Sequence, residues 1–419
     1  MRISRRVAAA AAAMAVVLPL SACGGNDDSG GNNTVEVFTW WADGGEKAGL
    51  DALVGVFGQQ CPGQTFRNGA VAGGAGSNAK QVLASRLQTG APPDTFQAHA
   101  GAELVDYVKA GQVEDLSGEY DQWGLRHAFP QGLIDNLTYQ GKIYSVPANI
   151  HRANVVWTNK KVLDRAGVTT ALTSMDQLFA ALDKVKRSGV AAPLALGKDW
   201  TQLMLLETVL ISDLGPQKFT GLWNGATDWK SAEVAKGIDD YKRLLGYSNQ
   251  DRDALDWTDA ERLIMNGRAA YQLMGDWEAA DLDAKGFKDY GYFTFPGNGK
   301  TFQWLADSFT LPRNAPNPDG ARCWLKTVGS TDGQQAFNTK KGSIPARTDA
   351  DPAKYPTYQQ SAMADWKTFA QVPSCAHGAA CSQGLQGAAN SAVAKFSTDL
   401  DTAALQNALA QATSQYATS

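Results

Sequence analysis

The fold class is decided by residues 35–60, VEVFTWWADGGEKAGLDALVGVFGQQ, which place a strand directly before a helix. Residues 35–40 are mostly β-branched or aromatic and alternate in polarity, which predicts a strand. From residue 46 onward, apolar side chains recur at helical spacing, and Pro62 ends the predicted helix. A strand that leads into a helix in this way is typical of an α/β protein.

The same patterns continue outward along the chain. Strands are predicted at 65–70, 94–98, 143–147, 154–157, 293–295 and 304–311, and helices at 78–88, 175–188, 201–213, 231–245, 258–266 and 407–417. Because strands and helices alternate in the first half, we expect an α/β lobe there.

Proline and glycine punctuate the chain near 145–152, 296–300 and 342–346. Three interior crossing points predict two lobes that are each built from separate stretches of chain. We expect an N-terminal lobe and a C-terminal lobe, formed respectively by residues 35–147 plus about 301–344, and by 148–300 plus about 345–419.

The composition excludes several classes of protein. The chain has 419 residues, of which 44% are hydrophobic and 19% charged, as in ordinary globular proteins. Its net charge of −4 offers no electrostatic footprint for a nucleic-acid backbone, so no nucleic-acid partner is expected. No long apolar run follows the first twenty positions, which argues against a polytopic membrane protein.

The N-terminus indicates export. Residues 1–22 have three arginines before an apolar stretch, as signal peptides do. The sequence Leu20-Ser21-Ala22-Cys23 resembles the lipobox of bacterial lipoproteins, and that resemblance implies that Cys23 carries a lipid. A plain signal peptide with an incidental cysteine is the alternative. Residues 23–34 are polar and glycine-rich, which predicts a flexible tether. We therefore expect a protein held at the extracytoplasmic face of the membrane.

Four cysteines remain after Cys23, namely Cys61, Cys323, Cys375 and Cys381. An oxidising compartment permits disulfides, and four cysteines allow three pairings. The short separation in CAHGAAC favours a bridge between Cys375 and Cys381. The alternative, a metal site on these two cysteines and His377, has an unusual ligand spacing, and no metal is expected.

A glycine motif opens the helix predicted at 78–88. Residues 74–79, GAGSNA, fit the G-x-G-x-x-A pattern of dinucleotide-binding folds, and Asp94 follows at the usual interval. Because the export signal argues against a nucleotide cofactor, we expect no cofactor here. A tight turn that presents backbone N–H groups to a neutral ligand is the alternative interpretation.

Tryptophan is abundant, with 12 residues in the chain. Several lie beside polar residues at predicted loop edges: Trp40, Trp41, Trp200, Trp257 and Trp277. Core packing is the plain interpretation, but flat rings with carboxylates and amides around them also suit a sugar cleft. Gly-x-Ser-x-Gly and His-Glu-x-x-His do not occur. No pair of acids is singled out as the carboxylates of a glycosidase.

Nine motifs in order resemble a known family: FTWWADGGE, GGAGSNAKQVL, PPDTFQAHAG, YSVPANIHRANVVW, APLALG, LMGDW, LADSF, KKGSIPAR and CAHG. The chain is similar to the family 1 extracellular solute-binding proteins that feed sugars to bacterial ABC importers, and among them to glucose- or glucose/mannose-binding proteins. The resemblance implies two α/β lobes, joined by a hinge of several segments, with the ligand cleft between them.

The resemblance also implies a set of sugar-binding residues: Trp40, Trp41, Glu46, Gln97, His99, Asn149, Trp257, Trp277, Asp307, Lys341 and His377. Some assignments leave alternatives open. His151 either contacts sugar or only holds the hinge, Lys340 could replace Lys341, and Asp276 could cap a helix. His127 matches no motif and is expected at the surface.

We therefore expect a lipid-anchored, monomeric receptor that captures a monosaccharide and delivers it to the permease subunits of an ABC importer. The importer's own subunits spend the ATP, so this chain needs no cofactor and is not an enzyme. A receptor for a disaccharide or oligosaccharide, a secreted glycoside hydrolase and a passive adhesion protein are the alternatives.

Overall fold

The computed structural model describes residues 33–169 and 172–417. The predicted signal peptide, Cys23 and nearly all of the predicted tether lie outside these residues. Thr34, assigned to the tether from sequence, already begins the first strand. Among the described residues, no helix combines the length and apolar character needed to cross a membrane.

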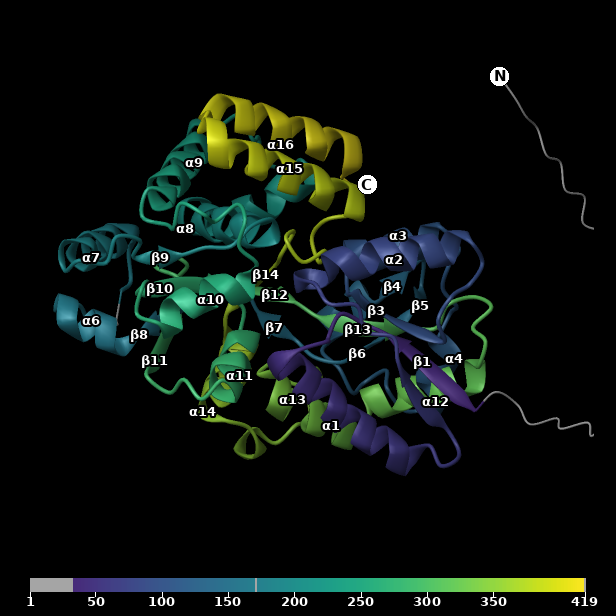
Figure 1. Ribbon diagram of the computed structural model, residues 1–419. Coiled ribbons are helices and arrows are strands. Elements are labelled where there is room, and N and C mark those ends of the chain that lie inside the picture. Colours follow the sequence, from purple (N-terminus) through teal and green to yellow (C-terminus); the bar gives the residue numbers. More distant parts are fainter. Residues whose placement is uncertain (1–32, 170–171, 418–419) are drawn as a thin grey trace, which may run out of the picture. The chain divides into compact units, whose positions relative to one another are not determined.

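The largest sheet has five strands in the order β2-β1-β3-β13-β6 (Figure 1). The strands are β2 (Thr65–Asn68), β1 (Thr34–Phe38), β3 (Thr95–His99), β13 (Asp307–Thr310) and β6 (Ser145–Pro147). β1 pairs in parallel with β2 and β3, while β13 runs antiparallel to both β3 and β6. The sheet therefore unites strands that lie far apart in the sequence.

Three smaller sheets complete the strand set of the described residues. One has the order β11 (Tyr290–Thr294), β8 (Val155–Asn159), β10 (Tyr271–Met274), β9 (Leu194–Ala195). Another has the order β14 (Ala370–Pro373), β12 (Thr301–Leu305), β7 (His151–Arg152), and the last pairs β4 (Thr138–Tyr139) with β5 (Lys142–Ile143). Since β7 follows β6 closely and β12 directly precedes β13, the β14-β12-β7 sheet connects to the five-stranded sheet twice.

Helices surround these sheets, which confirms the predicted α/β class (Figure 1). They are α1 (Gly44–Gln60), α2 (Ser77–Gln88), α3 (Ala102–Lys109), α4 (Ser117–Gln122), α5 (Gln131–Asn136), α6 (Lys160–Ala166), α7 (Met175–Arg187), α8 (Trp200–Asn224), α9 (Ala232–Leu245), α10 (Trp257–Met265), α11 (Trp277–Ala284), α12 (Pro318–Gly329), α13 (Thr331–Lys341), α14 (Thr357–Thr368), α15 (Gln383–Asp399) and α16 (Thr402–Tyr416). The short 3-10 turns η1 (Gly74–Gly76) and η2 (Pro352–Lys354) precede α2 and α14. α1 packs along α13, and α15 and α16 pack on α8 and α9.

Two predicted strands are divided in the structure. The strand predicted at 143–147 is divided at Tyr144 between β5 and β6, which lie in different sheets. The strand predicted at 304–311 is interrupted at Ala306, because β12 pairs with β14 and β7 whereas β13 pairs with β3 and β6. The helix predicted at 201–213 ends close to the expected residue, because Gly215 leaves the helical conformation with φ of 72° and Pro216 follows it without an N–H to donate. Beyond this kink, a second helical segment of α8 continues to Asn224.

Two disulfides join the four cysteines. Cys61, at the end of α1, bonds Cys323 in α12 across a separation of 262 residues. Cys375 bonds Cys381 across six residues, which is the pairing that the short loop favours. Because both sulfurs of this second pair are bonded to each other, the alternative metal site on this loop is excluded.

Candidate functional site

A cavity lies where the ends of β1, β3 and β12 meet the first residues of three helices. α8, α10 and α11 each begin with a tryptophan, and all three rings reach the cavity. The lining residues are Trp40, Glu46, Gly74, Ala75, His99, His151, Trp200, Trp257, Trp277, Leu305, Asp307, Lys341 and His377. Segments distant in sequence thus converge on one aromatic and charged enclosure.

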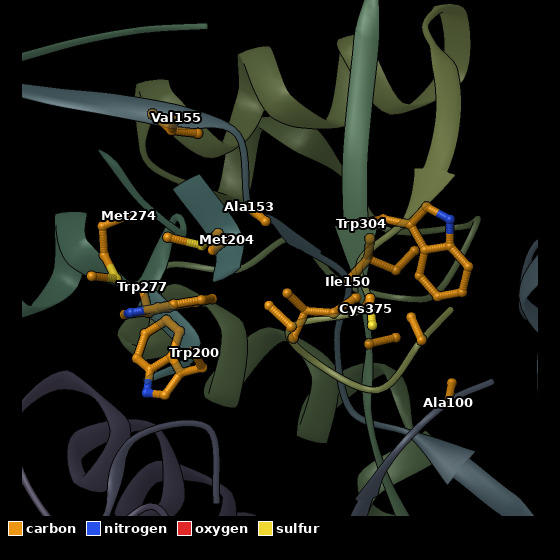
Figure 2. Close-up of a cluster of buried hydrophobic side chains, with 14 of the residues drawn as sticks. Ala100, Ile150, Ala153, Val155, Trp200, Met204, Met274, Trp277, Trp304 and Cys375 are labelled. Atoms are coloured by element: carbon orange, nitrogen blue, oxygen red, sulfur yellow. The ribbon is translucent and has the colours of Figure 1, made fainter. Parts of the chain in front are cut away.

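Aromatic rings make up much of the wall. The rings of Trp200 and Trp277 lie 6.0 Å apart between their centroids (Figure 2). The imidazole of His377 stands edge-on to both, at 5.2 Å from Trp200 and 5.5 Å from Trp277. On the β1 side, the ring of Trp40 lies 4.9 Å from that of His99. Such faces suit the C–H surface of a flat ligand.

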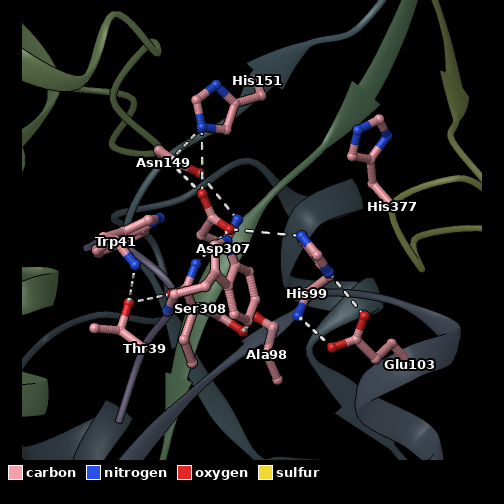
Figure 3. A network of polar contacts seen from close by, with 12 residues as sticks. Thr39, Trp41, Ala98, His99, Glu103, Asn149, His151, Asp307, Ser308 and His377 are labelled. Carbon is pink, nitrogen blue, oxygen red and sulfur yellow. Dashed lines mark hydrogen bonds and ion pairs between the residues drawn. The ribbon is translucent and has the colours of Figure 1, made fainter. Parts of the chain in front are cut away.

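Asp307 is the buried carboxylate of the site (Figure 3). Its Oδ1 accepts a hydrogen bond from Gln97 Nε2 at 2.8 Å, and its Oδ2 accepts one from Asn149 Nδ2 at 2.8 Å. Burial alone would raise the pKa of Asp307, but the positive charge of His151 and its other neighbours holds this pKa well below its usual range. Asp307 is therefore a fixed, ionised acceptor.

His151 bridges two carboxylates. Its Nδ1 contacts Asp276, and its Nε2 lies 3.3 Å from Asp307 Oδ2. Burial would lower the pKa of His151, but Asp276 and Asp307 outweigh burial and raise it. Asp276 stands at the start of α11 without capping it, because its carboxylate binds His151 and the backbone N–H of Arg152. The capping role considered for Asp276 is therefore wrong.

Glu46 and Lys341 form an ion pair at the cavity, with 2.9 Å between Oε1 and Nζ. Burial raises the pKa of Glu46, and Lys341 partly opposes that rise. The ammonium of Lys341 also lies 5.4 Å from the centroid of the Trp277 ring, a favourable cation–π contact. Lys341 is buried, whereas Lys340 is exposed, so Lys341 is the one that reaches the cavity.

Glu103 contacts the nitrogen of His99 that faces away from Asp307. The His99 Nδ1 and Glu103 Oε2 atoms are 2.7 Å apart, and Lys80 lies 2.8 Å from the same carboxylate. Burial alone would raise the pKa of Glu103, but Lys80 and His99 lower it to about 2. The carboxylate therefore fixes the imidazole, whose Nε2 lies 3.7 Å from Asp307 Oδ1.

Eight of the eleven residues expected at the site line the cavity: Trp40, Glu46, His99, Trp257, Trp277, Asp307, Lys341 and His377. Trp41 does not, because it is fully buried against Phe309 and Phe337. Gln97 and Asn149 lie behind the wall, where they orient Asp307.

Five further residues line the cavity, and Trp200 and His151 are the two aromatic ones among them. Trp200 was noted only for its polar neighbours, and its position at the start of α8 was one residue outside the predicted helix. His151 was ambiguous because sequence cannot show that Asp276 and Asp307 meet at its two nitrogens. The exposed His127 lies at the surface, as expected.

The glycine motif lies at the cavity and does not form a nucleotide site. Gly74 and Ala75 line the wall, and α2 begins just after them. Asp94, which would contact a ribose in a dinucleotide fold, is buried and accepts from the backbone N–H groups of Glu36 and Asn317 at 2.7 and 2.6 Å. Its role is structural. Among the described residues, no group of His, Cys, Asp and Glu could hold a metal ion.

The model of one family, bacterial extracellular solute-binding protein, matches residues 41–335. This chain belongs to that family. A relative from Pyrococcus horikoshii, an uncharacterised ABC transporter extracellular-binding protein, is 34% identical over 88% of this chain and 84% of its own. A probable sugar-binding periplasmic protein from Mesorhizobium japonicum is 32% identical over 80% of each chain.

Two further relatives are named for monosaccharides. The xylose/arabinose-binding protein of Haloferax volcanii is 29% identical over 85% of this chain and 79% of its own. The glucose-binding protein of Saccharolobus solfataricus is more distant, at 26% identity over 58% of this chain and 46% of its own.

Solved structures confirm the two-lobe fold. A bacterial solute receptor described as specific for β-D-galactopyranose superposes with a TM-score of 0.81 at 19% identity, covering 92% of this chain and 98% of that one. A chitin oligosaccharide binding protein superposes with a TM-score of 0.80 at 21% identity, covering 92% and 99%. The family and the relatives above 30% identity make this solute-binding protein a sugar receptor of an ABC importer and not an enzyme.

Proposed function

We propose that the cavity binds one pyranose sugar, most simply glucose or mannose. The observation that carries this proposal is the enclosure itself. Trp40, Trp200, Trp257 and Trp277 surround a space whose rim holds ionised Asp307 and the Glu46–Lys341 pair. Aromatic faces cover the C–H surface of a pyranose, and charged groups make strong hydrogen bonds with its hydroxyls.

The close spacing of the rings favours a single sugar unit over a longer ligand in the inner cavity. The centroids of the Trp200 and Trp277 rings lie 6.0 Å apart, and that of His377 lies 5.2 and 5.5 Å from them. The relatives from Haloferax and Saccharolobus, both named for monosaccharides, add support. The choice of a hexose over a pentose rests on the family motifs of the sequence.

An adjoining outer cavity supports the alternative ligand, a disaccharide or oligosaccharide. This space shares Trp40, Glu46, Gly74 and Trp257 with the inner cavity. Its remaining wall includes Asp43, Asp256, Arg262, Asp281 and Lys285. A second sugar unit that extends from the inner cavity would lie there, so disaccharides belong in the ligand screen.

The lobes are proposed to close over the ligand. The N-terminal lobe would comprise residues 35–147 and about 301–344, and the C-terminal lobe residues 148–300 and about 345–419. The five-stranded sheet draws its strands from the first set, and the sheet β11-β8-β10-β9 from the second, which supports this division. The sugar would contact residues of both lobes, so binding would favour the closed state.

Lipid attachment at Cys23 is proposed from the signal-like segment and its lipobox. A chain carrying Cys23→Ala should appear in the medium instead of the membrane fraction, and mass spectrometry should find no diacylglycerol on it. Retention of that variant at the membrane would contradict the lipid anchor.

The protein is proposed to act as a monomer, which size-exclusion chromatography with light scattering tests.

Thermal unfolding with added sugar tests the ligand class. A ligand at one hundred times its Kd adds about 2.7 kcal/mol to the free energy of unfolding. Glucose or mannose should therefore raise the unfolding temperature, and Trp257→Ala should abolish that rise without unfolding the protein. A rise with maltose or cellobiose alone would favour the disaccharide alternative. No rise with any sugar would contradict the proposal.

A further inference from the structure

The loop that carries His377 is anchored to α8 through a single buried carboxylate. Glu207 lies fully buried within α8, and residues 374–381 pass beside it after β14. Its carboxylate accepts from the backbone N–H groups of Cys375 and Ala376 at 2.5 and 3.2 Å. The Cys375–Cys381 disulfide closes the same loop from its other end.

Side chains supply two more hydrogen bonds to Glu207. Ser374 Oγ lies 2.9 Å and Gln303 Nε2 lies 3.0 Å from its Oε2 atom. All four partners are neutral donors, and an ionised carboxylate is the form that accepts from every one of them. Burial raises the pKa of Glu207 to about 7 and outweighs these four hydrogen bonds, which lower it. Above pH 7 Glu207 is therefore an acceptor only.

The direction of the hydrogen bond between Ser374 and His377 follows from the number of protons available. A serine hydroxyl has one proton, and Ser374 donates it to Glu207. Ser374 Oγ also lies 2.9 Å from His377 Nδ1, so in this contact Oγ must accept and Nδ1 must carry the proton. Burial and the neighbouring His99 and His151 lower the pKa of His377 well below its usual range. The ring is therefore neutral, and its Nε2 bears a lone pair.

Among residues 33–169 and 172–417, the remaining nitrogen of His377 has no hydrogen-bond partner. Nε2 is buried and unpaired although the ring lines the cavity between Trp200 and Trp277. Figure 3 shows His377 without a bond to the network around Asp307. A buried polar atom without a partner is costly, which suits an atom that a ligand would satisfy.

We infer that Glu207 and Ser374 are positioning residues that hold His377 in its Nδ1–H tautomer, so that Nε2 accepts a hydrogen bond from a hydroxyl of the sugar. The inference rests on the proposed function for the identity of the donor. It adds a rule for ligand specificity: the ligand group next to His377 Nε2 must donate a hydrogen bond. A ligand group that can only accept hydrogen bonds would bind poorly there.

Nuclear magnetic resonance of the ligand-free protein tests the tautomer directly. The chain has four histidines, so ¹⁵N labelling of histidine gives a small set of ring signals, and His377→Gln identifies those of His377. At pH 8 we expect a protonated Nδ1 and an unprotonated Nε2. A proton on Nε2 in the wild-type protein would overturn the inference, whether or not any variant folds.

Variants test the positioning. Ser374→Ala removes the acceptor for Nδ1–H, and Glu207→Gln places an amide donor beside Ser374. Both should shift the His377 tautomer toward Nε2–H and weaken glucose binding about tenfold. Glu261→Gln is the matched control, because Glu261 is another buried acid and its partner is Lys285. An unchanged His377 tautomer in both Ser374→Ala and Glu207→Gln would overturn the positioning role of Ser374 and Glu207.

Fluorinated sugars test the ligand side. Fluorine can accept but cannot donate, so one glucose analogue with fluorine in place of a hydroxyl should lose affinity for the wild-type protein about tenfold. In Ser374→Ala, the difference in affinity between glucose and this analogue should be smaller than in the wild-type protein. Equal binding of every analogue would overturn the acceptor role of Nε2. Failure of the wild-type protein to bind glucose or mannose would instead reject the proposed ligand and leave the tautomer result standing.

Discussion

The carboxylate of Asp307 is held in place before any ligand arrives. Gln97 fixes one oxygen and Asn149 the other, while Asn149 Oδ1 accepts from the backbone N–H of Asp307 at 2.9 Å. Gln97 also accepts from Thr39 and from the backbone N–H of Trp40, which ties the end of β1 to the same network. An acceptor oriented in this way loses little freedom on binding.

Asp307→Asn should lower sugar affinity about 100-fold, because hydrogen bonds to a charged acceptor contribute about 1.5–3 kcal/mol each. Calorimetric titration of the variant measures this. Asp94→Asn is the control: Asp94 is also buried, but it only accepts from backbone N–H groups away from the cavity. We expect that control to lower stability while its folded fraction binds normally. Equal sugar affinity of Asp307→Asn and the wild-type protein would contradict the role of Asp307 as a sugar-binding residue.

Gly74 is needed for close approach of two rings. A Cβ at this position would lie 2.7 Å from Trp257 Cδ1 and 2.9 Å from Trp200 Nε1. Gly74→Ala should displace these rings and weaken sugar binding at least about tenfold, with an overpacking cost of about 1–3 kcal/mol. Gly55→Ala provides the comparison, because nothing lies within 4 Å of its added methyl group. It should bind normally and be slightly more stable.

Glu103 links the site to acid stability. Its pKa is about 2 in the folded protein and near 4.3 in an unfolded chain. The carboxylate therefore contributes on the order of 3 kcal/mol above pH 4.3, and this contribution is lost as the pH falls toward 2. Urea unfolding should show Glu103→Gln less stable than wild type at pH 7, with a smaller difference at pH 3.

An exposed ion pair gives the contrast for this experiment. Glu233 and Lys218 form a pair in which both side chains are more than half exposed. Glu233→Gln should change the free energy of unfolding by less than about 1 kcal/mol at either pH. A pH-independent loss in Glu103→Gln would show that packing, not charge, accounts for its effect.

At the scale of elements, the contact between α8 and the 374–381 loop couples pH to the cavity. When Glu207 becomes protonated, its carboxyl O–H needs a hydrogen-bond acceptor. Of its four partners, Ser374 Oγ is the one that can accept, since the other three contact Glu207 through N–H groups. Protonation would thus make Ser374 donate to His377 Nδ1. Burial is the main cause of the raised pKa of Glu207.

The ¹⁵N signals of His377 should therefore move from the Nδ1–H pattern at pH 8 toward the Nε2–H pattern at pH 5.5. Glu207→Gln should show no such transition near pH 7. Because the folded pKa of Glu207 lies above its unfolded value, its contribution to stability is present below about pH 4.3 and is lost as the pH rises through 7. A constant tautomer between the two pH values in the wild type would contradict this coupling.

Elements with strong local patterns were predictable from sequence. The alternating strand at β1 and the amphipathic face of α1 appear nearly where the pattern places them. The division of residues 301–310 into β12 and β13 was not predictable, because local sequence continues through Ala306 while the pairing partners change. Register with distant strands is tertiary information that a single segment does not carry.

The candidate site was predictable only through family motifs. The motifs name Asp307, Lys341 and His377, and these three meet at one cavity. They do not separate residues that line it from residues behind it, which is why Gln97, Asn149 and Trp41 were grouped with the wall. That distinction depends on the direction of each side chain, and on contacts such as that between Trp41 and Phe337.

At the scale of the whole molecule, the site depends on segments that the sequence separates widely. Glu46 pairs with Lys341 across 295 residues, and His151 meets Asp276 across 125. The cavity therefore exists only when both ends of the chain are folded together. This arrangement suits a receptor that captures a ligand between lobes, because the bound sugar would add contacts to segments from each.

Calorimetric titration of the purified protein with glucose, mannose, galactose, xylose, maltose and cellobiose tests the central claim most directly. We predict one-to-one binding of glucose or mannose, with a weaker response to the other sugars. Binding of maltose or cellobiose alone would contradict a cavity built for one pyranose. Heats indistinguishable from dilution for all six sugars would contradict the assignment of this cavity as the sugar site.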